Sequence, residues 1–149
     1  MKIEEFEQKL PTLYETPFTS DHPIDRRLQP VFESMEGMAT ENKLALLNLA
    51  VSLMDEGEAY FEVGTWKGMS LCGAMFENTQ FRCFACYNFA EFGGPKDELF
   101  ANIEKIGRNR MKVYSFWFGK KMTQWIYFDT DIDFPELTEN GLFFKKQLD

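Results

Sequence analysis

Apolar positions in the middle of the chain repeat at the spacing of an α-helix. Between Thr40, a good N-cap residue, and Gly57, the residues Leu44, Leu47 and Val51 fall on one face. The pattern predicts a helix of about 15 residues that Gly57 ends. Its wide apolar face indicates that this helix packs on a sheet.

Strands and further helices alternate after this helix. Residues 59–63 favour a pleated strand, and the Gly64 that follows can take the positive φ of a sharp turn. Residues 81–87 are mostly apolar with little alternation, which is typical of a parallel strand buried on both faces. In chain order the predicted elements are a helix at 2–10 ended by Pro11, an irregular connector to Pro30, a short helix at 31–35, the helix from Thr40, a strand at 59–63, a helix at 66–78, a strand at 81–87, a helix from Pro95 to Gly107, strands at 111–118 and 124–128, and a last strand at 142–144.

This alternation predicts a three-layer α/β fold of the Rossmann-like kind, with a mostly parallel sheet and right-handed crossovers. We expect residues 1–39 to form a helical cover and connector, and residues 40–149 to form the cofactor-binding domain. A turn at the carboxyl end of the first strand lies where open α/β sheets bind ligands.

Composition excludes several classes of partner. The 149 residues carry a net charge of -8, and Lys and Arg are nowhere clustered, which argues against a nucleic-acid partner. No apolar run reaches the ~20 residues that span a bilayer, so we expect no membrane partner. The N-terminus lacks the apolar core of a signal peptide, and a cytoplasmic location is the expectation.

The cysteines and the single histidine offer little chemistry. Cys83 and Cys86 form a CxxC pattern, but residues i and i+3 of a strand point to opposite faces, and no second pair or His cluster completes a zinc site. We interpret both as buried small hydrophobes. His22 lies in a turn-forming setting and is interpreted as a loop residue.

The turn after the first strand fits neither of two common phosphate-binding motifs. Gly64 and Gly68 are separated by three residues with no third glycine, so the dinucleotide fingerprint fails, and no Gly-Lys-Ser/Thr follows for a P-loop. Glu62 at the end of the strand would repel a phosphate but could receive an ammonium group. An uncharged or zwitterionic cofactor is therefore expected.

Two motifs give the chain a family resemblance. Phe61-Glu62-Val63-Gly64-Thr65-Trp66-Lys67-Gly68-Met69-Ser70 is followed about twenty residues later by Asn88-Phe89-Ala90-Glu91-Phe92-Gly93-Gly94-Pro95. Both resemble motifs of small bacterial members of the class I S-adenosylmethionine-dependent methyltransferases. The resemblance covers roughly residues 35–108 and implies S-adenosylmethionine as cofactor and a methyl acceptor that the sequence does not identify.

The resemblance also implies the site residues. Glu62 and the glycine turn would line the methionine end of the cofactor, and residues 87–89 would lie by its ribose and adenine. The implied cofactor-binding set is Glu62, Gly64, Thr65, Trp66, Lys67, Gly68, Ser70, Tyr87, Asn88 and Phe89.

The chain departs from the family in three places. Tyr87 stands where the family has an acidic residue that takes both ribose hydroxyls. Residues 126–131 resemble a later family segment, but Thr130 and Ile132 replace its Gly and His. Asp129 and Asp131 offer oxygen ligands for a divalent cation, but an acidic surface loop is the favoured interpretation, so no metal is expected.

The third departure is length, because the chain ends near where a fifth strand should begin. We therefore expect a truncated or diverged member whose open sheet edge favours self-association into a homo-oligomer. The predicted function is methyl transfer from S-adenosylmethionine. The alternative is a catalytically silent remnant that acts as a binding or interaction module, which Tyr87 and the missing strands favour.

Overall fold

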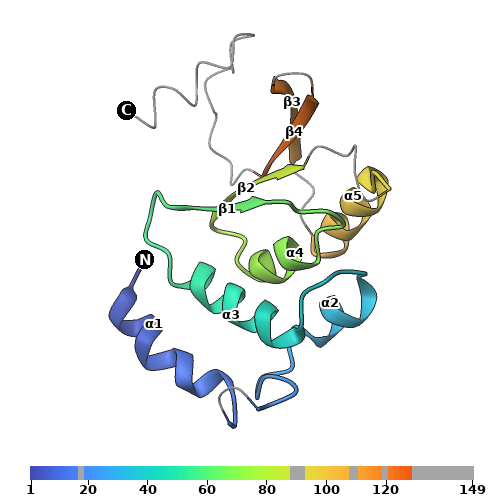
Figure 1. Ribbon diagram of the computed structural model, residues 1–149. Helices are drawn as coiled ribbons and strands as arrows, with labels where there is room; N and C mark the ends of the chain where they lie inside the picture. Colours follow the sequence, from blue (N-terminus) through green and yellow to red (C-terminus); the bar gives the residue numbers. More distant parts are fainter. Residues whose placement is uncertain (17–18, 88–92, 108–110, 119–120, 129–149) are drawn as a thin grey trace.

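The structure is a computed structural model that describes residues 1–16, 19–87, 93–107, 111–118 and 121–128, the last two ranges as backbone only. Its sheet contains β1 (Ala59–Val63), β2 (Arg82–Tyr87), β3 (Met111–Phe118) and β4 (Lys121–Phe128). The strand order is β1-β2-β4-β3. The α/β class predicted from the alternation is confirmed (Figure 1).

Only one pair of neighbouring strands in the described sheet is parallel. β1 pairs with β2 in parallel, and Val63 lies opposite Cys86, whereas β4 pairs antiparallel with both β2 and β3. The expectation of a mostly parallel sheet is therefore wrong for this part of the chain. The reason is local: only two residues separate β3 from β4, and so short a link joins antiparallel strands, since a parallel pair needs a long crossover.

The α-helices match the predicted order with shifted ends, but the 3₁₀ helix that contains Pro11 lies where an irregular connector was expected. The third and longest helix starts after Thr40, whose hydroxyl accepts a hydrogen bond from the Lys43 backbone N–H at 3.3 Å, as predicted for an N-cap. In chain order the described helices are α1 (Ile3–Lys9), the 3₁₀ helix η1 (Leu10–Leu13), α2 (Gln29–Ser34), α3 (Glu41–Ser52), α4 (Met69–Met75) and α5 (Lys96–Lys105).

Two helix boundaries correct the sequence prediction. α3 ends at Ser52 rather than at Gly57, because the Leu53 carbonyl accepts from the Lys2 backbone N–H at 2.8 Å, and Gly57 (φ 89°) belongs to the turn before β1. α4 begins at Met69 rather than at Trp66. Trp66 and Gly68 have φ values of 44° and 84°, which a right-handed helix cannot contain.

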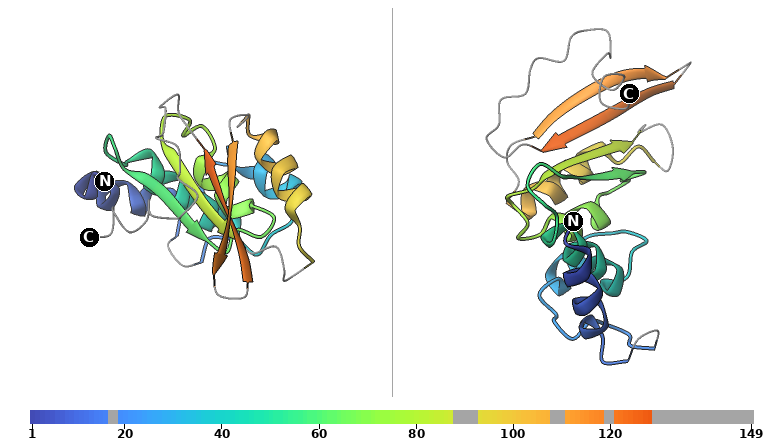
Figure 2. Two further views of the ribbon diagram at one scale, coloured as in Figure 1. Left: turned by 90° about the horizontal axis from the view of Figure 1, so that it is seen from above. Right: turned by 90° about the vertical axis from the view of Figure 1, so that its left-hand side faces the viewer.

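Helices α2 to α5 contribute side chains to one core on one face of β2. Cys83 and Ala85 are fully buried there, in one core cluster with Leu44, Leu71 and Leu99 from three helices. The alternate residues Phe84 and Cys86 are only half-buried. β2 is thus not buried on both faces as expected, and the described part of the chain has one helical layer rather than two. In Figures 1 and 2 the β3–β4 hairpin lies at the end of the molecule opposite α1.

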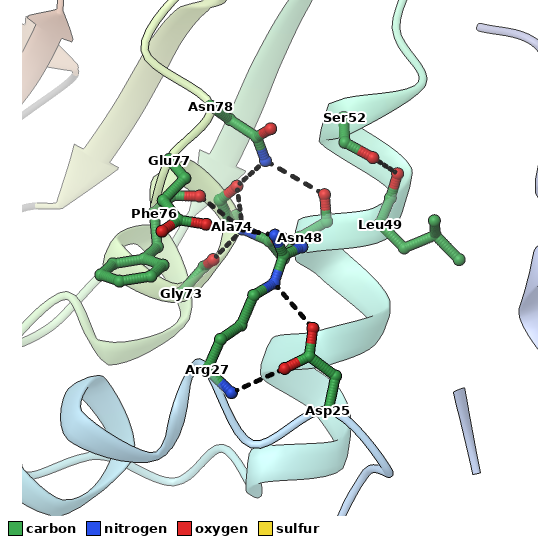
Figure 3. Close-up of polar contacts among 10 residues, drawn as sticks. All are labelled: Asp25, Arg27, Asn48, Leu49, Ser52, Gly73, Ala74, Phe76, Glu77 and Asn78. Atoms are coloured by element: carbon green, nitrogen blue, oxygen red, sulfur yellow. Dashed lines mark hydrogen bonds and ion pairs between the residues drawn. The ribbon is translucent and has the colours of Figure 1, made fainter. Parts of the chain in front are cut away.

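A polar network joins α3 to the end of α4 (Figure 3). The Asn48 side-chain amide, which is 1% exposed, donates to the carbonyl oxygens of Gly73 (2.9 Å) and Phe76 (2.8 Å). Asn78 donates to the carbonyls of Asn48 and Ala74 at 3.1 and 2.8 Å. The carbonyls of Gly73, Ala74 and Phe76 lie at the end of α4, where a helix leaves its carbonyl groups without intrahelical partners, and the two side-chain amides satisfy them.

Candidate functional site

The turn that follows β1 leaves the sheet beside the end of β2. The Gly64 backbone N–H donates to the Cys86 carbonyl at 3.0 Å, which places the turn next to Tyr87. Gly64 has a φ of 88°, and a Cβ atom built on it would meet no atom of the described residues within 4 Å. Its side-chain side therefore faces open space, so that a ligand could approach the backbone there.

Gly68 has a different environment from Gly64. It is buried at a φ of 84°, and a Cβ atom built on it would overlap Leu99 Cδ1 of α5. Its backbone N–H donates to the Thr65 carbonyl at 2.8 Å, and its carbonyl accepts from Cys72 at 2.7 Å. Gly68 thus closes the turn and allows α5 to pack closely against it.

The Glu62 carboxylate lies on the core-facing side of β1 and is half-buried. Its Oε1 accepts a hydrogen bond from the Thr65 hydroxyl at 2.5 Å, and its Oε2 accepts from the Tyr60 hydroxyl at 2.8 Å. Thr65 is 3% exposed, and Tyr60 packs against the core cluster. Burial, followed by the nearby Glu62 charge, raises the pKa of Tyr60, which keeps its hydroxyl protonated as a donor.

Lys67 is engaged by its neighbours. Its Nζ forms an ion pair with Glu36 at 2.6 Å and lies 5.0 Å from the centroid of the Trp66 ring. The hydrogen bond to Glu36 raises the pKa of Lys67. The Lys67 carbonyl accepts from the Asn102 side chain at 2.9 Å, so α5 also holds this part of the turn.

The structure brings together the first seven implied site residues, from Glu62 to Ser70, on the end of β1, the turn that follows it and the start of α4. Tyr87 lies at the end of the neighbouring strand and is 9% exposed. Asn88 and Phe89 lie outside the described residues, and so do Asp129 and Asp131. Ser70 is half-buried on the first turn of α4.

Sequence reasoning missed three contributors to this site. Tyr60 is two residues before Glu62, and in a strand that spacing puts both side chains on one face, so its contact could have been anticipated. Glu36 and Asn102 approach the turn from distant elements. No sequence signal of this chain pairs them with Lys67.

Two hollows away from the glycine turn lie on the N-terminal part of the chain. One, of about 630 Å³, is lined by His22 and by other polar residues of the connector, including Glu15 and Asp21. The other, of about 300 Å³, lies between η1, the connector and α3. His22 is exposed, which agrees with its interpretation as a loop residue.

The described residues hold no group of three or more His, Cys, Asp or Glu side chains placed to bind a metal ion. None of the helices that the structure describes combines the length and apolar character needed to cross a membrane.

No protein-family model, no curated protein and no solved structure matches this chain. The fold and the site themselves define an α/β protein. A glycine turn and a hydrogen-bonded carboxylate lie at the end of its pair of parallel strands.

Proposed function

We propose that this chain binds S-adenosylmethionine at the carboxyl ends of β1 and β2 and transfers its methyl group to an acceptor. The main support for this proposal is that Glu62 and Gly64 lie together at the end of β1. A carboxylate held by two hydroxyls stands two residues before a turn whose glycine faces open space. The sequence resemblance of both motifs to class I methyltransferases supports the same assignment.

The residues at β1 fit the methionine half of this cofactor. Glu62 supplies a negative charge for an ammonium group, and Gly64 would let the ligand lie against the backbone. The residue at the end of β2 fits the ribose less well, since Tyr87 replaces a carboxylate. Loss of a charge-assisted hydrogen bond of roughly 1.5–3 kcal/mol would weaken binding by about one to two orders of magnitude.

The reaction asks little chemistry of the side chains. When bound, the cofactor supplies a methyl group on a positively charged sulfur, which an acceptor can attack directly. Catalysis would then rest on orientation, because Glu62 and the turn would hold the methionine end of the cofactor in one position. No nucleophile from the chain is required.

Isothermal titration with S-adenosylmethionine and S-adenosylhomocysteine tests this proposal. We expect a micromolar Kd, which is a binding free energy of about -8 kcal/mol, and a weaker affinity for Glu62→Ala. Glu56→Ala is the matched control, because it removes the same charge from an exposed position in the turn before β1. Absence of heat from a folded sample would overturn the proposal.

A second function is favoured by a different observation. β1 lies at an edge of the described sheet, and Val63 is 71% exposed. Such an edge suits a binding or interaction module that keeps the fold without turnover. Gly64→Val separates the two functions: it abolishes cofactor binding in the first and lowers only the stability of the fold in the second.

A further inference from the structure

We infer that Tyr60 and Thr65 are positioning residues that fix the Glu62 carboxylate for a ligand carrying an amino group. This inference rests on the proposed function, because it concerns how the same site selects its ligand. Tyr60 lies outside both motifs, and the resemblance implied for Thr65 only a place in the lining of the cofactor site. The inference gives both residues the role of orienting Glu62, and it names the amino group as the part of the ligand that Glu62 binds.

The contacts of Glu62 carry the inference. One hydroxyl reaches each carboxylate oxygen: Thr65 Oγ1 lies 2.5 Å from Oε1, and Tyr60 Oη lies 2.8 Å from Oε2. The two donors come from opposite sides in sequence, one from within β1 and one from the turn after it. The carboxylate is thereby held at both oxygens and loses its freedom to rotate.

Both donors are themselves held in place. Thr65 is 3% exposed, and the Tyr60 ring packs against the core cluster. The raised pKa of Tyr60, caused first by burial, means that its hydroxyl remains a donor at every pH at which the protein would be used. A fixed donor of this kind orders Glu62 before any ligand arrives, which lowers the entropy cost of binding.

The acceptor capacity of the carboxylate points to the ligand chemistry. An ionised carboxylate has about four lone-pair sites and donates nothing. The two hydroxyls occupy one site on each oxygen, so both oxygens keep acceptor capacity for a further donor. An ammonium group offers a positive charge and three donors, whereas a ligand without the amino group gains nothing from this arrangement.

The test compares two probes that differ in the amino-acid part. S-adenosylhomocysteine carries the amino group, and 5′-methylthioadenosine lacks the whole amino-acid end. We expect Tyr60→Phe and Thr65→Val each to weaken S-adenosylhomocysteine about three- to tenfold in titration calorimetry, and to leave 5′-methylthioadenosine unchanged. Thr65→Ser keeps the hydroxyl and should restore wild-type affinity. Circular dichroism checks that each variant is folded.

A double-mutant cycle separates positioning from general packing. In a Glu62→Gln background, Tyr60→Phe and Thr65→Val should have no further effect on S-adenosylhomocysteine, because the hydroxyls act through the carboxylate. If Tyr60→Phe fails to fold, the comparison of Thr65→Val with Thr65→Ser carries the test.

The possible failures are distinguishable. If the wild type binds S-adenosylhomocysteine and the variants bind it equally well, the inference is overturned and the proposed function stands. Equal weakening of both probes would assign the two residues a structural role and would also overturn the inference. A wild type that binds neither probe overturns the inference together with the proposed function.

Discussion

Gly68 and Leu99 are so close that a Cβ atom added to Gly68 would overlap Leu99 Cδ1. The contact joins the glycine turn to α5, and Leu99 is fully buried, so its side chain cannot easily move away. The two glycines of the turn therefore carry different constraints: Gly68 needs both a positive φ and the absence of a side chain, whereas Gly64 needs only the positive φ.

We predict that Gly68→Ala destabilises the fold more than Gly64→Ala does. Left-handed backbone costs an alanine about 1–2 kcal/mol at either position, and overpacking against Leu99 adds about 1–3 kcal/mol at Gly68 alone. Urea unfolding of the two variants measures the difference in the free energy of unfolding. Equal destabilisation would show that the space beside Gly68 is not limiting.

The Asn48 network predicts a large effect for a single amide. Asn48→Ala removes the donor for the Gly73 and Phe76 carbonyls and the acceptor for Arg27 Nη2, which lies 2.6 Å from Asn48 Oδ1. Leaving such buried groups without partners costs about 1–3 kcal/mol. Thermal unfolding should show the lower melting temperature, with Gln80→Ala, an exposed residue nearby, as the control. An unchanged melting temperature would mean that water replaces the amide.

The cysteines should differ in their reaction with a thiol reagent. Burial raises the pKa of Cys72 to about 12 and also raises the pKa of the half-buried Cys86. Because only the thiolate reacts, labelling of the native protein at pH 8 should be slower than that of free cysteine and should speed up as the pH rises.

Absorbance titration with a disulfide reagent follows this reaction. We expect Cys86 to react first, and Cys72 and Cys83 to react only when denaturant unfolds the chain, since both are fully buried. A Cys86→Ser variant identifies the early thiol. Rapid labelling of three thiols without denaturant would contradict the burial of these side chains.

The position of β1 at an edge of the described sheet predicts concentration-dependent association. Val63 is 71% exposed on this strand, and an exposed apolar edge invites pairing with another chain. We expect light scattering to show a mass that rises over micromolar concentrations, and Val63→Lys to reduce it by placing a charge on the edge. A sharp monomer peak across that range would rule out this association.

The local features of the fold followed from local residue chemistry. Thr40 starts α3 as predicted, and Pro95 and Gly107 bracket α5, because capping and proline geometry depend on only a few neighbouring residues. The order of the α-helices and strands from residue 3 to residue 128 was predictable for the same reason, whereas the 3₁₀ helix η1 was not predicted.

Strand direction and layer number were not predictable from the pattern. An apolar strand such as Met111–Phe118 has the same residue pattern whether its partner strand is parallel or antiparallel. The direction of the pair is set by the length of the link to β4. The candidate site was partly predictable from the sequence, because the first motif indicated Glu62 and Gly64. The contact of Lys67 with Glu36 spans 31 residues, and only the folded chain reveals it.

The Asn48 side chain ties α3 to the end of α4, whereas α1 buries none of its residues. Amide hydrogen exchange should therefore divide the helices by rate. Amides of α3 and α4 should exchange together through cooperative opening of the core, and those of α1 should exchange earlier by local fraying. The last unit of the described chain to open would then be the pair of helices α3 and α4.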